Sequence, residues 1–130
     1  MALEKLPKEQ WKEFFDNFSK KFCKDKIPEF AQIEVLSPEL GDQEETLWVK
    51  LMGITYDPKD DVLDIALGEL DLDHMIYHPT EIWVDVDEDG FINEMEVIHD
   101  NGELSEVINL RRYKPAPDYE TKELIPPQED

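Results

Sequence analysis

The sequence is poor in cysteine and glycine, and each scarcity excludes a class of protein. The one cysteine, Cys23, permits no intramolecular disulfide and no cysteine-rich metal site. Five glycines form no glycine-rich phosphate loop, and no serine lies in a Gly-x-Ser-x-Gly nucleophile turn. No apolar run approaches the roughly 20 residues of a membrane span. The N-terminus also lacks the apolar stretch of a signal peptide, so we expect a cytoplasmic protein.

Negative charge dominates the chain, and it is unevenly placed. The formal net charge is −20 at pH 7. Residues 1–26 hold seven lysines against five acidic residues, whereas residues 27–130 hold six basic and 28 acidic residues. A body this negative repels phosphate backbones and anionic membrane surfaces, so we expect neither nucleic acid nor membrane as a partner. A basic protein partner or a bound cation remains compatible with the charge.

The first part of the chain has the periodicity of an amphipathic helix over about residues 7–24. Pro7 suits a first helical position, and Pro28 prevents the helix from continuing. Five aromatic residues recur at spacings of three and four and define one face: Trp11, Phe14, Phe15, Phe18 and Phe22. A stripe of this kind is typical of core packing against a sheet, and a groove on a partner is the rarer alternative.

After residue 31 the period changes to two, which predicts strands. The expected strands cover residues 33–36, 47–56, 62–67, 82–86, 92–98 and 104–110, whereas residues 69–79 fit either a helical turn or a strand. Asp89-Gly90 and Asn101-Gly102 are typical of tight hairpin turns. We therefore predict an α+β domain over residues 1–112, with the helix packed on a twisted antiparallel sheet of about five or six strands. Residues 113–130 are rich in proline and acid and predict a disordered tail.

Residues 85–96 match the spacing of the twelve-residue calcium loop of EF-hands. The candidate metal ligands are Asp85, Asp87, Asp89, Asn93 and Glu96, and Gly90 would allow the sharp turn. The flanking residues disagree with this interpretation, because Pro79 and the β-branched and aromatic residues that follow it favour a strand over an entering helix. We therefore favour a plain hairpin turn and keep a Ca²⁺ site as the alternative.

Two histidines offer a second candidate site. His74 and His78 are four residues apart, a spacing that on a helix would place both imidazoles on one face and would suit zinc. The sequence has no HExxH motif, and surface or capping histidines are the simpler interpretation. Neither this pair nor any other group of residues forms a recognisable catalytic constellation.

Several segments resemble an uncharacterised bacterial family, domain of unknown function 5335. They are residues 6–11, 14–19, 33–36, 53–61 and 73–79, and the resemblance extends over about residues 6–112. A looser likeness links residues 56–67 and 87–98 to another small bacterial family, domain of unknown function 2283. In that family the second segment looks like strand, turn and strand. Neither resemblance implies an activity, a cofactor or a catalytic residue.

The leading functional hypothesis is a non-enzymatic interaction or regulatory protein. Its partner would be another protein, with a homodimer through an exposed sheet edge or face as one form. The first alternative is a calcium-binding module that uses the acidic loop 85–96. The second is a small metal-dependent hydrolase around His74 and His78. No catalytic or cofactor-binding residue is assigned.

Overall fold

The computed structural model describes residues 3–24, 28–37, 41–44, 48–68 and 72–112. The predicted tail over residues 113–130 lies outside the described residues, as do residues 69–71 of the segment left open between helix and strand. The elements follow in the order β1 (Glu4–Lys5), a 3₁₀ helix (Lys8–Gln10), α1 (Trp11–Phe22), β2 (Phe30–Ser37), β3 (Gly41–Glu44), β4 (Val49–Asp57), β5 (Val62–Leu67), β6 (Leu72–Tyr77), β7 (Glu81–Val86), β8 (Ile92–His99) and β9 (Leu104–Arg111).

The predicted fold class is confirmed, because one N-terminal helix packs on an antiparallel sheet. The number of strands exceeds the prediction, since β1, β3 and β6 join the six expected ones. β1 has only two residues, and β3 reads as a polar loop in sequence. β6 settles the open choice for most of residues 69–79 in favour of a strand.

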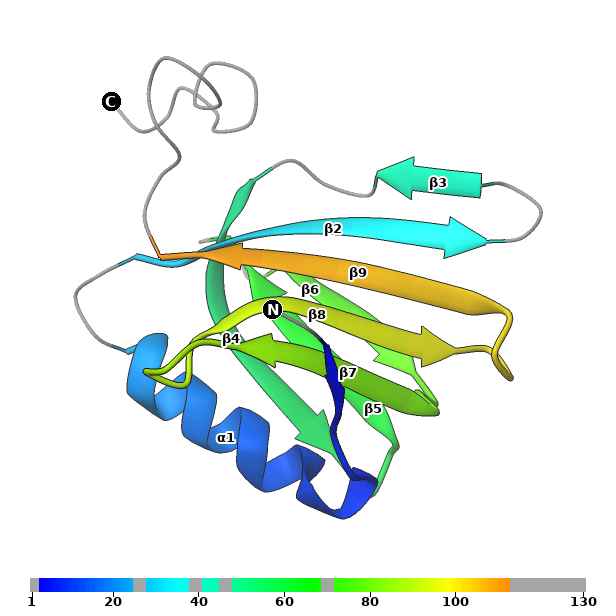
Figure 1. Ribbon diagram of the computed structural model, residues 1–130, viewed down its shortest axis with the longest axis horizontal. Helices are drawn as coiled ribbons and strands as arrows, with labels where there is room; N and C mark the ends of the chain where they lie inside the picture. Colours follow the sequence, from blue (N-terminus) through cyan, green and yellow to red (C-terminus); the bar gives the residue numbers. More distant parts are fainter. Residues whose placement is uncertain (1–2, 25–27, 38–40, 45–47, 69–71, 113–130) are drawn as a thin grey trace.

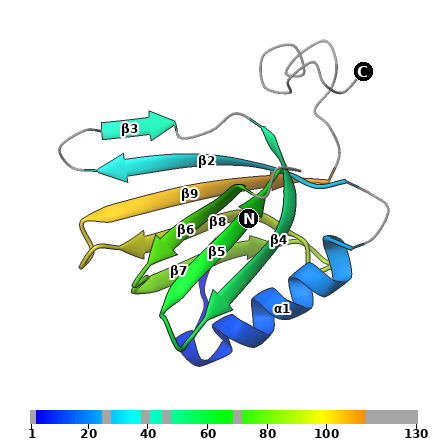
Figure 2. The same ribbon diagram turned by 180° about the vertical axis from the view of Figure 1, so that it is seen from behind.

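All strand pairs are antiparallel, and the sheet order is β1-β7-β8-β9-β2-β4-β5-β6, with β3 beside β2. β2 pairs with β4 through Phe30 and Ala31 only, whereas β4 pairs with β5 along most of its length. β4 therefore diverges from β2 after this short pairing, and β4, β5 and β6 separate from the part of the sheet formed by β1, β7, β8, β9 and β2. Both views show β4, β5 and β6 lying over β7, β8 and β9 as a second layer (Figures 1 and 2).

The aromatic face of α1 fills the space between these layers, beside β4. Trp11 meets Tyr56 of β4 edge to face, and Phe18 and Phe22 both contact Phe91 in the β7–β8 turn. The predicted aromatic stripe is thus core, with Phe14 only partly buried. The helix runs along the open edge of β4 (Figure 2). It therefore closes a side of the molecule in addition to covering a sheet face.

Ser19 ties α1 to that edge as a neighbouring strand would. Its hydroxyl donates to the carbonyl of Ile54 at 2.7 Å and accepts from the Ile54 N–H at 2.9 Å. These are backbone groups that β5 cannot reach, because Ile54 and Ile65 form a non-hydrogen-bonded pair. The side chain thereby satisfies an edge that would otherwise be open.

We expect Ser19→Ala to lower the free energy of unfolding by about 2 kcal/mol. The variant leaves one N–H and one C=O of β4 without their partner, and unsatisfied groups of this kind cost about 1–3 kcal/mol. Chemical denaturation measures the change. Asn17→Ala, an exposed position on the same helix, is the control and should change stability by less than about 0.5 kcal/mol. Equal effects of both substitutions would contradict the bridging role of Ser19.

Candidate functional site

β6 presents an open strand edge. Within the described part of the chain it pairs with β5 alone. The N–H of His78 donates to the carbonyl of Asp61 at 2.8 Å, which fixes the phase of the β5–β6 ladder. Bonded and non-bonded pairs alternate in antiparallel strands. The backbone groups of Asp73, Met75 and Tyr77 therefore point away from β5, toward the open edge.

The side chains at this edge are also exposed. Met75 is 38% exposed and Tyr77 58%, which makes them two of the four exposed large apolar side chains in the described residues. Natural proteins usually protect an edge with lysine, proline or a covering segment. Here β1 covers part of β7 and Ser19 covers part of β4, whereas the exposed side chains of β6 are one acidic residue, Asp73, and two apolar residues, Met75 and Tyr77. This edge is suited to contact with another chain.

A groove, which we call the β6 groove, lies between this strand and the β8–β9 turn. Its cavity volume is about 700 Å³, within the range of ligand-binding clefts. The two sides are formed by exposed residues of β6 and by residues of the turn. The lining residues are Lys8, Asp61, Met75, Tyr77, His78, Pro79, Thr80, His99, Asp100, Asn101 and Leu104.

At one part of the groove, the carboxylate of Asp61 contacts three polar side chains. The hydroxyl of Tyr56 donates to its Oδ1 at 2.6 Å, Nδ1 of His78 lies 3.2 Å from Oδ2, and Nζ of Lys8 lies 3.8 Å from Oδ1. Desolvation opposes ionisation of Asp61, but the hydrogen bonds from Tyr56 and His78 and the charge of Lys8 outweigh it and lower its pKa. Burial, followed by the bond to Asp61, raises the pKa of Tyr56. Asp61 is therefore held as a carboxylate and Tyr56 as a neutral phenol.

A second carboxylate links the two layers behind the groove. Glu106 of β9 is buried, with 5% of its surface exposed. Nε2 of His74, from β6, lies 2.5 Å from its Oε1. Nε2 of His99, from β8, lies 2.9 Å from its Oε2 but is not aligned as a hydrogen bond. This His74–Glu106–His99 cluster fixes the position of β6 over β8 and β9.

The backbone of the groove is also unusual. Among the described residues, four non-glycine residues have positive φ, and all four line the groove: Asp61 (55°), His78 (54°), Asp100 (57°) and Asn101 (57°). Aspartate, asparagine and histidine adopt this left-handed conformation more readily than other non-glycine residues, and such positions also occur at functional sites. All three histidines of the chain line the groove or join the cluster behind it. The β6 groove is therefore the candidate functional site.

The acidic loop 85–96 forms a strand–turn–strand hairpin, as the favoured interpretation predicts. Asp85 lies near the end of β7, Asp87 and Asp89 lie in the turn, and Asn93 and Glu96 lie along β8. Oδ1 of Asp87 accepts from the backbone N–H groups of Asp89 and Phe91. Oδ2 of Asp89 accepts from Arg112, and Glu96 accepts from Ser105. Calcium binding by these five residues remains a prediction.

His74 and His78 lie on and just after a strand, not on a helix, so the helical spacing proposed for a shared metal does not apply. His74 reaches inward to Glu106, whereas His78 contacts Asp61 at the rim. Across the described ranges, no group of three or more His, Cys, Asp or Glu residues is arranged to hold a metal ion. The sequence analysis missed Glu106 and His99, since their contact with His74 depends on the stacking of the two layers.

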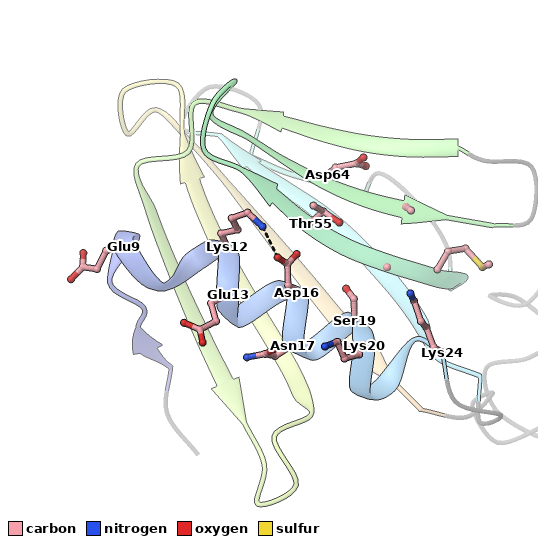
Figure 3. Close-up of a pocket in the computed structure, with 13 residues that line it drawn as sticks. Glu9, Lys12, Glu13, Asp16, Asn17, Ser19, Lys20, Lys24, Thr55 and Asp64 are labelled. Carbon is pink, nitrogen blue, oxygen red and sulfur yellow. Dashed lines mark hydrogen bonds and ion pairs between the residues drawn. The ribbon is translucent and has the colours of Figure 1, made fainter.

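Another groove runs between the polar side of α1 and the outer face of β4 and β5 (Figure 3). Lysine and acidic side chains from the helix line one wall, and Lys12 and Asp16 form an ion pair at 2.7 Å. Thr55 and Asp64 lie on the sheet wall. The charges here are mixed and exposed, with no buried polar cluster comparable to that of Glu106. We therefore regard this groove as the weaker candidate.

Asp64 makes stability depend on pH. Desolvation, together with its hydrogen bond to Asp73 and the charge of that neighbour, raises the pKa of Asp64 to about 6 from 3.8. The folded state thus binds this proton more tightly than the unfolded chain. The resulting stabilisation is complete below pH 3.8 and is lost as the pH rises through about 6.

We therefore expect Asp64→Asn to stabilise the protein at pH 7.5 by about 1 kcal/mol, a figure reduced for solvent screening. At about pH 4 the difference from the wild type should nearly vanish, because the carboxyl is then protonated in the fold. Denaturant unfolding at the two pH values measures both changes. Asp60→Asn, in the exposed β4–β5 turn, is the control. Stabilisation independent of pH would contradict this explanation.

Comparisons with known proteins agree with this fold and assign no activity. A family model described as "Family of unknown function (DUF5335)" matches residues 2–119. An uncharacterized protein of Aquifex aeolicus (strain VF5) is 44% identical over 116 residues, which cover 89% of this chain and 96% of that protein. The crystal structure of the Bacillus subtilis YojF protein is similar with a TM-score of 0.51, 15% identity, and coverage of 89% and 98% of the two chains. No helix among the described residues is long and apolar enough to cross a membrane.

Proposed function

Because the chain belongs to the family of unknown function DUF5335, its role has to be argued from its own surface, and we propose that it is a non-enzymatic interaction protein. Its β6 edge would accept an extended segment of a protein partner as an additional strand. One observation carries this proposal: β6 combines outward-facing backbone groups at Asp73, Met75 and Tyr77 with exposed apolar side chains.

The β6 groove supports the same role. Strand addition derives affinity from main-chain hydrogen bonds and specificity from contacts with alternate side chains. The open edge supplies the hydrogen-bonding groups, and the β8–β9 turn supplies a second wall for the added segment. The His74–Glu106–His99 cluster keeps β6 in place, so the strand is pre-formed for binding. Pre-formed elements lose less conformational entropy when they bind.

Site-specific photo-crosslinking in the native cytoplasm tests this proposal. A benzoyl-phenylalanine replaces Tyr77 in one variant and Met52 in the other. Met52 is the matched control, because it is 44% exposed but lies on β4, outside the β6 groove. We expect a discrete protein adduct from position 77 only, and its loss when Met75→Lys is added. Equal labelling from both positions, or adducts unaffected by Met75→Lys, would remove the proposal.

A further inference from the structure

We infer that the partner segment is extended and carries a lysine or arginine opposite Asp73, with apolar side chains at the positions that flank Met75 and Tyr77. This inference rests on the proposed function and specifies its partner. An added strand places alternate side chains beside those three residues, which share the exposed outer face of β6. The side chains of β6 thus define a pattern of one cation and two apolar residues at alternate positions.

The charge at this edge favours a cation. Asp73 is exposed, and Asp64 of β5 lies near it on the same outer face. Asp64 pairs with Met75 and Ala66 pairs with Asp73, so the two carboxylates are diagonal neighbours, with Asp73 on the edge strand and Asp64 one strand inward. Two carboxylates this close repel one another at neutral pH. A partner ammonium or guanidinium group beside Asp73 relieves that repulsion and gains a charge-assisted contact.

The same charge disfavours two other occupants of the edge. A second copy brings another −20 charge to the interface, and repulsion between two such negative bodies opposes their association. The chain's own residues 113–130 hold two lysines against five acidic residues and include four prolines. Proline lacks the N–H that a ladder requires, which makes this segment a poor added strand. A cationic segment from another protein fits the edge better.

Synthetic peptides of about seven residues, long enough to span the six residues of β6, provide the test. The probe has threonine at every second position, and the three positions between the threonines hold one lysine and two valines. The matched control has glutamate in place of the lysine. Titration followed by NMR gives the affinities, and hydrogen exchange reports the amides of Asp73, Met75 and Tyr77. At low ionic strength we expect the lysine peptide to bind at least tenfold more tightly and to protect these amides. Screening by salt should reduce the difference.

Two variants sharpen the result. Asp73→Asn should bring the two peptide affinities close to each other, whereas Asp85→Asn on β7 should preserve the tenfold difference. Equal binding of both peptides at β6 would overturn the inferred partner chemistry and leave strand addition standing. If neither peptide binds, both the inference and the proposed function fail. A dimer that dissociates on Tyr77→Lys would identify a second copy as the occupant of the edge. Protection of the β6 amides in a monomer without peptide would identify the chain's own tail as the occupant. Either result overturns the inference.

Discussion

Replacing Phe18 by alanine is expected to lower the free energy of unfolding by about 4 kcal/mol, in the usual range for a buried phenylalanine. Phe18 is 4% exposed and packs against Phe22 at 5.2 Å and Phe91 at 5.6 Å between ring centroids. The substitution leaves a cavity where α1, β4 and the β7–β8 turn meet, and the surrounding structure usually relaxes only in part to fill such a cavity. Thermal or denaturant unfolding gives the change.

Phe14→Ala is the matched control for this prediction. It removes the same side chain from the same helix, but from a partly buried position at the margin of the core. We expect a loss well below that of Phe18→Ala, since less apolar area returns to water. A melting temperature unchanged by Phe18→Ala would show that the helix does not contribute to the core as described.

Removal of the buried carboxylate should have an effect of similar size. We expect Glu106→Ala to cost about 3 kcal/mol, because it deletes both contacts of the cluster and leaves His74 and His99 without a shared partner. β6 loses its anchor over β9 in this variant. Hydrogen exchange at β6 should therefore accelerate more than exchange at β7, which lies beyond β8 in the first layer.

Glu96→Ala distinguishes a specific anchor from a general effect of lost charge. Glu96 lies on the neighbouring strand β8, is partly exposed, and accepts one hydrogen bond from Ser105 at 2.6 Å. We expect its removal to cost about 1 kcal/mol, the contribution of one hydrogen bond. If both glutamate variants lose the same stability and β6 exchanges normally, Glu106 does not hold the layers together.

Local patterns predicted much of this fold. The spacing of the aromatic residues in α1 and the alternation in β5, β7, β8 and β9 report burial on one face of an element, which the sequence encodes directly. The hairpin over residues 81–99 was also predictable, because β-branched residues surround a turn containing Gly90 at a φ of 93°. The calcium-loop spacing arises in the same segment because aspartate and glycine also favour turns.

The candidate site was harder to predict from the sequence than the fold. That β6 is an edge strand depends on the order of the sheet, and its six residues alone do not reveal which neighbours they lack. The contacts of Glu106 join β6, β8 and β9, whose segments are separated along the chain. The four left-handed residues also gave no signal as a group, since they lie in three separate connections: Asp61 before β5, His78 after β6, and Asp100 with Asn101 between β8 and β9. Long-range stacking of the layers, absent from local periodicity, creates this site.

The pairing of β2 with β9 has a consequence for biosynthesis. These strands lie side by side in the middle of the sheet, with seven residue pairs from Phe30 with Arg111 to Leu36 with Ser105 (Figure 1). A ribosome must therefore synthesise nearly the whole folded region before β2 meets its main neighbour. Such distant pairing slows folding, because loop closure precedes any compensating contact. We therefore expect the β9-facing edge of β2 to stay unpaired until synthesis of the folded region is nearly complete, and exposed strand edges of this kind are prone to aggregation.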